Sequence, residues 1–232
     1  IHFVIAEKND NVWIAQRQGR AKNSNDLTQP AILKMMAMGG EGTIIERLKQ
    51  LHIVPLAISY EYDPCDYLKA REYQLRRDLP YWKKTAEDDL ESMLVGIKGY
   101  KGHIFYKCAP CIDEWLDTVD EELPKNKLFD TIAAHIDHEI HSNYKLYPIN
   151  YVALDMIQDT RVYEEYYTVE DYQNFNTYLD GQIEKIDIEN RDDKFLRTCL
   201  LTQYAYPAKN YIAASSESGR FKSLLNRLTF KK

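Results

Sequence analysis

Apolar residues fall in short runs in the first half of the chain and at helical spacing in the second half. The short runs predict strands, because a run of four to eight apolar residues is typical of a buried strand. After Pro124 the apolar residues recur every three or four positions, which is the period of an α-helix. The pattern therefore predicts an α/β part followed by a mainly helical part. The predicted strands are residues 1–5, 12–15, 52–60 and 103–106.

Tyrosine is abundant in the helical part. Its ring is apolar and its tip is polar, so it suits half-buried packing, interfaces and the lining of an acyl groove. We expect packing as its main role, with a lipid groove as the alternative. A break between helices is predicted at residues 146–150, and loops at Gly181 and at residues 187–193. The tyrosines concerned are Tyr144, Tyr147, Tyr151, Tyr163, Tyr166, Tyr167, Tyr172 and Tyr178.

Composition narrows the class of protein. The chain has 232 residues, 44% of them hydrophobic, which suffices for a core. Its net charge of −6 opposes general nucleic-acid binding, because neutralising phosphates needs a basic surface. No segment reads as a signal peptide or approaches the roughly 20 apolar residues that span a bilayer. We therefore expect a cytoplasmic protein whose membrane contact, if it has one, is peripheral and at the inner membrane surface.

The segment 12–22 combines an apolar run with a glycine turn and three cations, Arg17, Arg20 and Lys22. Gly19 allows the backbone to turn where a side chain would obstruct a ligand. Guanidinium groups offer paired donors that match phosphate oxygens, and a lysine adds a compact charge. The segment predicts an anion site for a phosphate-bearing ligand. A solvated basic turn is the alternative reading of the same residues.

Two stretches in order resemble motifs of the glycerolipid acyltransferases. Residues 14–22, Ile-Ala-Gln-Arg-Gln-Gly-Arg-Ala-Lys, are similar to the third motif of that family, and residues 52–60, with Pro55, to the fourth. Residues 102–110 resemble a later strand that ends in proline. The resemblance covers about residues 3 to 115. It implies an acyltransferase-like α/β fold over residues 1–122, with a mixed sheet flanked by helices, and a helical tyrosine-rich extension over residues 123–232.

The resemblance implies transfer of a fatty acyl group to the hydroxyl of a glycerol phosphate or a lysophospholipid. Acyl-CoA or acyl-carrier protein would be the donor, and neither a cofactor nor a metal is expected. Arg20, supported by Arg17 and Lys22, would hold the acceptor phosphate, while Gln18 stands where the family has glutamate. The implied substrate-binding residues are Arg17, Gln18, Gly19, Arg20, Lys22 and Pro55.

The catalytic motif of that family is a histidine followed at the fifth position by aspartate. None of the six histidines here has this spacing, although His2 is followed by Glu7. We therefore expect no catalytic residue in this chain, and expect the sequence to be a piece of a longer protein whose catalytic base lies upstream of Ile1. A non-catalytic anion- or lipid-binding member of the same fold is the alternative.

The four cysteines include the pair Cys108-Ala-Pro-Cys111, which follows a predicted strand and precedes a predicted helix at residues 112–119. This placement is used by thiol redox sites, where a helix N-terminus favours the thiolate. Asp113 and Glu114 follow at once and disfavour a thiolate. Two reduced cysteines are the expected state, with a redox function as an alternative. A zinc site would need further ligands, and no second cysteine pair occurs.

Three histidines, His135, His138 and His141, occupy one predicted helix. About 100° per residue places them opposite its apolar face, so we expect them on an exposed polar surface, with a metal site as the alternative. The apolar face consists of Phe129, Ile132, Ala133, Ile136 and Ile140.

The last residues form a basic amphipathic segment in an otherwise acidic chain. Residues 215–218 could cap a helix that either lies on an anionic membrane or docks on the core of the protein. The apolar positions are Phe221, Leu224, Leu225 and Leu228, and the basic ones are Arg220, Lys222, Arg227, Lys231 and Lys232.

Overall fold

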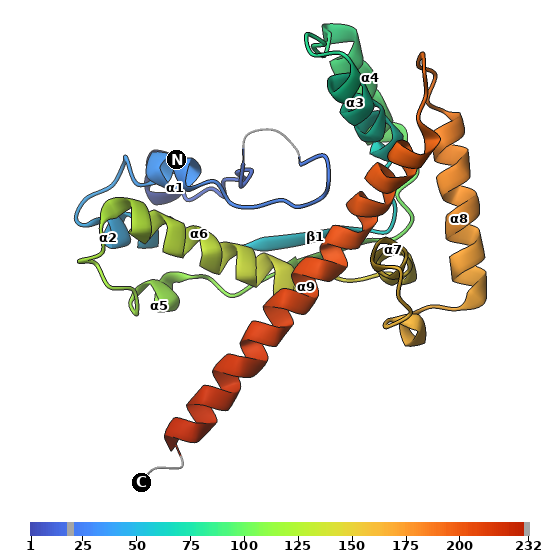
Figure 1. The fold of residues 1–232 in the computed structure, drawn as a ribbon. Coiled ribbons are helices and arrows are strands. Elements are labelled where there is room, and N and C mark those ends of the chain that lie inside the picture. The colour runs from blue at the N-terminus through green and yellow to red at the C-terminus, as the bar shows by residue number, and fades with distance from the viewer. Residues whose placement is uncertain (18–20, 230–232) are drawn as a thin grey trace. The chain divides into compact units, whose positions relative to one another are not determined.

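The computed structural model describes residues 1–17 and 21–229, with side chains as far as residue 216 (Figure 1). The described chain is mostly helical with one small sheet. The strands are β1 (Leu56–Tyr60) and β2 (Ile104–Cys108). The helices are η1 (Phe3–Glu7, a π-helix), α1 (Pro30–Met36), α2 (Ile44–Lys49), α3 (Asp66–Asp78), α4 (Ala86–Lys98), α5 (Asp113–Leu116), α6 (Lys125–Ser142), α7 (Pro148–Gln158), η2 (Glu164–Tyr166, a 3-10 helix), α8 (Val169–Glu184) and α9 (Asp193–Thr229).

The chain forms two compact units, each built from segments that are distant in sequence. Unit 1 comprises Ile1–Arg20, Asp26–Ala57 and Tyr106–Tyr144, and unit 2 comprises Ala21–Asn25, Ile58–Phe105 and Lys145–Lys232. The sequence predicts one domain boundary, after residue 122. Each unit instead contains residues from before and after that boundary. The boundary between the units crosses both β-strands.

Unit 1 is organised by α6. Its apolar face is buried as the helical spacing predicts, and it packs against α1, while α2 contacts α5. The prediction of three exposed histidines is wrong, because His135 and His138 are half-buried and His141 is 8% exposed. His141 donates a hydrogen bond to the Asp26 carbonyl oxygen at 3.3 Å. His141 lies at the edge of the apolar face, one residue after Ile140, so the burial of that face covers it too. The core contains Leu33, Met36, Ile45, Leu48, Ile112, Leu116, Leu128, Phe129, Ile132, Ala133, Ile136 and Ile140, among others.

Unit 2 is a helical core in which α7 packs against α9, the long red helix of Figure 1, and both contact α8. Tyrosine packing is confirmed, because Tyr147 and Tyr204 are buried in this core and other tyrosines pack against it. The Asn150 amide donates to the Tyr204 carbonyl oxygen at 2.9 Å and joins α7 to α9. The largest buried side chains of the core include Phe175, Leu179, Ile186, Leu196, Leu200 and Val152.

The predicted helix breaks are confirmed in two of three places. α6 ends at Ser142 and α7 begins at Pro148, a position where proline costs no helical hydrogen bond. The loop before α9 also lies where expected. The loop at Gly181 is wrong, because α8 continues through it to Glu184. A single glycine costs a helix about 1 kcal/mol, which the tertiary packing of α8 outweighs.

Two predicted strands are absent from the described residues. Residues 3–7 form the π-helix η1 instead of a strand, since a short apolar run does not distinguish helix from strand. Residues 12–15 are irregular, and Trp13 in this stretch is 71% exposed. A strand needs a neighbour for its backbone groups, and this stretch has none among the described residues. The apolar run of residues 12–15 therefore stays outside the sheet.

The predicted strands at residues 52–60 and 103–106 are confirmed as β1 and β2, with shifted ends. They pair antiparallel, and backbone bonds extend the ladder past both strand ends, from Glu61 to His103 at 2.9 Å and from Ala109 to Pro55 at 2.9 Å. Among the described residues the sheet has these two strands alone. None of the helices in the described residues has both the length and the apolarity needed to cross a membrane.

Candidate metal centre

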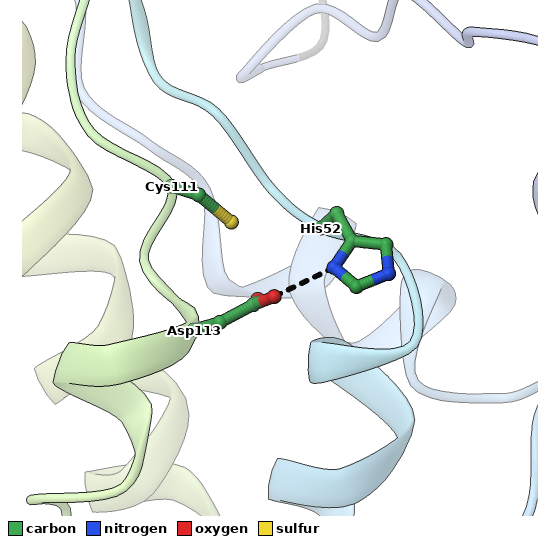
Figure 2. Close-up of side chains that lie close together, drawn as sticks. All are labelled: His52, Cys111 and Asp113. Atoms are coloured by element: carbon green, nitrogen blue, oxygen red, sulfur yellow. Dashed lines mark hydrogen bonds and ion pairs between the residues drawn. The ribbon is translucent and has the colours of Figure 1, made fainter.

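Three side chains of unit 1, His52, Cys111 and Asp113, converge at the surface (Figure 2). Each offers one ligand atom, and the three atoms lie within 4.8 Å of one another. His52 Nδ1 is 2.6 Å from Asp113 Oδ2. The cluster therefore combines a nitrogen, a sulfur and an oxygen donor. It is the one such group of three potential ligands found among the described residues.

Backbone pairing holds the two contributing segments side by side. The Ile112 N–H donates to the Ile53 carbonyl oxygen at 3.0 Å, which sets the residues beside the ligands in register. Leu51 and Ile112 are 5% and 1% exposed and belong to the core of unit 1. His52 thus follows one buried anchor directly, and Cys111 and Asp113 flank the other. The fold brings the donors together although 61 residues separate His52 from Asp113.

The backbone at His52 is in the left-handed region, with φ 47°. This conformation costs a non-glycine residue about 1 kcal/mol or more and is concentrated at functional sites and tight turns. Here it follows the end of α2 at Lys49 and turns the imidazole toward Asp113. The chain thus holds the histidine in place through a strained turn.

Two features of the cluster favour a cation. The Asp113 Oδ1 atom is buried and has no hydrogen-bond partner among the described residues, which leaves a carboxylate oxygen unsatisfied. Partial burial raises the pKa of the Cys111 thiol, and the carboxylates of Asp113 and Glu114 raise it further. A thiol in this setting stays protonated unless a positive charge is supplied. A metal ion would satisfy the carboxylate and ionise the thiol together.

Unit 2 contains a second histidine–carboxylate pair that lacks a thiol. His103 Nδ1 is 2.6 Å from Glu61 Oε2, the same separation as in the His52 pair. The imidazoles are similarly exposed, 83% for His103 and 71% for His52. The His103–Glu61 pair therefore serves as an internal control: it shows whether an exposed histidine–carboxylate pair binds a metal ion without a thiol.

The residues predicted to bind phosphate are engaged with carboxylates where they are described. Arg17 lies 3.5 Å from Asp26 in unit 1, and Lys22 forms an ion pair with Glu72 in unit 2. Two buried donors within the predicted motif, Gln16 Nε2 and Arg17 Nε, have no hydrogen-bond partner within the described chain.

The remaining predicted residues are placed as follows. Gln18, Gly19 and Arg20 lie outside the described residues, as do the side chains of the basic C-terminal segment from residue 217 onward. Pro55 is buried, and its carbonyl oxygen accepts the Ala109 N–H. It precedes β1 and cannot donate to the ladder, so it marks the start of the strand.

The cysteine pair at 108 and 111 is exposed and free. The raised pKa of Cys111 opposes a reactive thiolate and so opposes the redox alternative. The sequence shows each of the three cluster residues in another role: His52 in a strand motif, Cys111 in a cysteine pair and Asp113 as a charge beside it. The sequence spacing of residues 52 and 111 gives no sign that they are neighbours. Their proximity follows only from the backbone pairing of the two segments.

Comparison of the chain with known protein families, with curated proteins and with solved structures finds no match in any of the three. The chemistry open to the cluster is therefore that of its own nitrogen, sulfur and oxygen donors.

Proposed function

We propose that this protein binds a divalent transition-metal ion, best matched by zinc, through His52, Cys111 and Asp113. The observation that carries the proposal is the convergence of three different donors within 4.8 Å beside a buried carboxylate oxygen that has no partner among the described residues. A nitrogen, a sulfur and an oxygen suit zinc, whereas magnesium and calcium prefer oxygen ligands throughout.

The geometry needs a small adjustment to hold the ion. In a tetrahedral site with bonds near 2.1 Å, nitrogen and oxygen ligands stand about 3.4 Å apart. His52 Nδ1 and Asp113 Oδ2 are 2.6 Å apart, so the pair would widen by less than about 1 Å as the ion replaces the shared proton. The exposed imidazole of His52 has room for this movement.

Three protein ligands at an exposed site leave a fourth position to solvent. When bound there, zinc lowers the pKa of a coordinated water and polarises carbonyl or phosphoryl oxygens. His52 and Asp113 would meanwhile be held by the buried neighbours Leu51 and Ile112. The site would therefore resemble catalytic zinc sites, which keep one position for water or substrate, and not structural sites with four protein ligands.

The decisive experiment measures zinc binding to the metal-free protein by calorimetry, with cobalt as a spectroscopic substitute. Cobalt bound through Cys111 should give a sulfur charge-transfer band that Cys111→Ser abolishes. Cys111→Ser keeps the His52–Asp113 pair intact, so it isolates the thiol. We expect Cys111→Ser and Asp113→Asn each to weaken zinc binding by more than about 100-fold.

The matched controls are Cys108→Ser and His103→Gln, which remove a neighbouring thiol and the comparable surface histidine. Both should leave the affinity unchanged. Zinc binding that survives Cys111→Ser, or that His103→Gln abolishes, would place the ion elsewhere and contradict the proposal.

Metal binding should also stabilise unit 1, since the ligands join segments 61 residues apart. A free zinc concentration of about 100 times the dissociation constant adds about 2.7 kcal/mol to the free energy of unfolding. Thermal melts with and without zinc test this, and the gain should vanish in Asp113→Asn.

A second proposal, for anion binding and acyl transfer, is supported by the donors Gln16 Nε2 and Arg17 Nε, which have no partner in the part of the chain that the structure describes, and by the sequence resemblance of residues 14–22. In this proposal the chain belongs to an acyltransferase that acts on a glycerol phosphate or lysophospholipid. Glycerol phosphate would bind through Arg17 and Arg20, with acyl-CoA or acyl-carrier protein as the donor. Gly19 would allow close approach.

Calorimetry with glycerol 3-phosphate tests the anion site, and labelled acyl donors test the transfer. Loss of one charged hydrogen bond weakens binding by about 10- to 100-fold, which we expect for Arg20→Ala. Arg47→Gln is the control, because the Arg47 side chain bonds the Gly42 carbonyl oxygen instead. Failure of glycerol 3-phosphate to bind would contradict the phosphate site without affecting the metal proposal.

A further inference from the structure

Helix α4 in unit 2 exposes its apolar face and packs its polar face on the protein, the reverse of an ordinary surface helix. Four apolar residues at helical spacing are exposed: Leu90 at 68%, Met93 at 57%, Leu94 at 50% and Ile97 at 75%. We call these four the α4 stripe. The one buried residue of the helix is Ser92. Burial of a leucine or isoleucine contributes about 1.5 to 3 kcal/mol, so a partner that covers the stripe would gain a large free energy of binding.

The polar face of α4 explains how the helix is held. Arg71 of α3 lies 3.3 Å from Asp88 and 3.5 Å from Glu91. The Cys65 thiol donates to the Ser92 carbonyl oxygen at 3.3 Å. α3 therefore takes the side of α4 that carries the charges, and the α4 stripe faces away from it. Contiguous apolar residues left exposed in this way mark an interaction surface.

The charges beside the stripe indicate what covers it. Glu87 and Lys98 are exposed, stand at opposite ends of α4 and form no ion pair with any described residue. Eleven residues make about three turns, so both lie on one line along the helix, about 16 Å apart and beside the stripe. A surface with an acid at one end and a base at the other is complementary to a reversed copy of itself.

We propose that α4 is a self-association surface, on which a second copy of this chain packs its own α4 antiparallel about a two-fold axis. Leu90 then faces Ile97 of the second copy, and Met93 faces Leu94. In this register Glu87 of each copy meets Lys98 of the other with an axial offset of about 3 Å, which the long side chains span. A two-fold interface repeats both ion pairs by symmetry.

The first experiment measures the mass of the chain in solution by light scattering over a wide range of concentrations. The expected dimer has twice the 27.3 kDa of the single chain. Leu94→Glu should shift the midpoint of dimerisation by more than about 100-fold, because it places a charge at the centre of the contact. The control Val162→Glu changes another exposed apolar residue, 67% exposed against 50% for Leu94, that lies outside the stripe and should leave the dimer intact.

A second experiment tests the antiparallel register. Glu87→Lys and Lys98→Glu should each weaken the dimer, since each sets like charges together at both ends. Mixing these two single variants sets opposite charges at both ends and should restore dimers between them. Circular dichroism of each variant checks that α4 remains folded.

A protein that stays monomeric at every concentration overturns the proposal. So does a dimer that Leu94→Glu leaves unchanged, since another surface would then be responsible. In a parallel arrangement residue 87 would lie level with residue 87 of the second copy, so like charges would already face each other in the original protein and neither single variant would weaken the dimer.

Discussion

The substitution Asp66→Asn tests the cost of a buried charge in unit 2. Asp66 is fully buried, and its Oδ2 accepts hydrogen bonds from Tyr204 at 2.6 Å and Tyr178 at 2.7 Å. Its Oδ1 accepts the Tyr67 N–H at 2.6 Å. Burial raises the pKa of Asp66 from its ordinary value of 3.8 to about 6, although these hydrogen bonds lower it and Asp63 raises it further.

The sign of the pH effect follows from the raised pKa. Between pH 3.8 and about 6 the folded state holds a proton that the unfolded state has released. The free energy of unfolding therefore falls as the pH rises through this window. One pKa unit corresponds to about 1.4 kcal/mol, so the whole effect is about 3 kcal/mol.

Asp66→Asn removes this titration while keeping the volume and most of the hydrogen bonds. Urea unfolding followed by circular dichroism, at pH values from about 4 to 7, gives the stability of both proteins. The variant should gain about 2 to 3 kcal/mol relative to the original protein across that range. The control Asp78→Asn should show no comparable gain across this range, because the Arg77 hydrogen bond lowers the pKa of Asp78 and its titration therefore lies below the range. A stability difference between the original protein and the Asp66→Asn variant that stays constant with pH would refute the reasoning.

Three further predictions concern packing, capping and a histidine. Leu200→Ala should lower the free energy of unfolding by about 2 to 5 kcal/mol in urea titrations, because Leu200 is fully buried, and a loss below about 1 kcal/mol would contradict this packing. Thr168→Ala should cost about 1 kcal/mol, since it removes the acceptor of the Asp171 N–H at the start of α8; Thr177→Ala in the same helix is the comparison. Burial lowers the pKa of His135 to about 4 where its ring stacks on Trp115, so its share of stability is present above pH 6.5 and is lost as the pH falls through about 4. An NMR titration of His135 with a midpoint near 6.5 would contradict this burial.

Much of the helical part can be predicted from the sequence. The burial of Ile132, Ile136 and Ile140 follows from their spacing alone, and Pro148 marks the start of α7. The apolar runs also predict both strands of the sheet. These features depend on local pattern and on proline, which act over a few residues.

Other features depend on partners that the sequence does not reveal. Val12, Trp13 and Ile14 have the composition of a strand, but no neighbouring strand of the described chain pairs with them, so the sheet stays small. The candidate metal centre is equally non-local. Its ligands meet because Ile53 pairs with Ile112, and a one-residue shift in that register would turn the donors away.

The order of segments in the two units bears on how the chain is made. Residues 58–105 belong to unit 2, but the partners of α3 in α8 and α9 are synthesised after residue 145. Unit 1 is complete once Tyr144 has left the ribosome, while α3 and α4 are still without the helices that bury their neighbours. During translation α3 and α4 are therefore exposed to solvent, while the segments of unit 1 before and after them in the sequence are already complete. A ribosome stalled at a later point, when residue 144 has emerged from it, would display unit 1 folded and residues 58–105 open to protease, and completion of the chain would protect α3 through its contacts with α8 and α9.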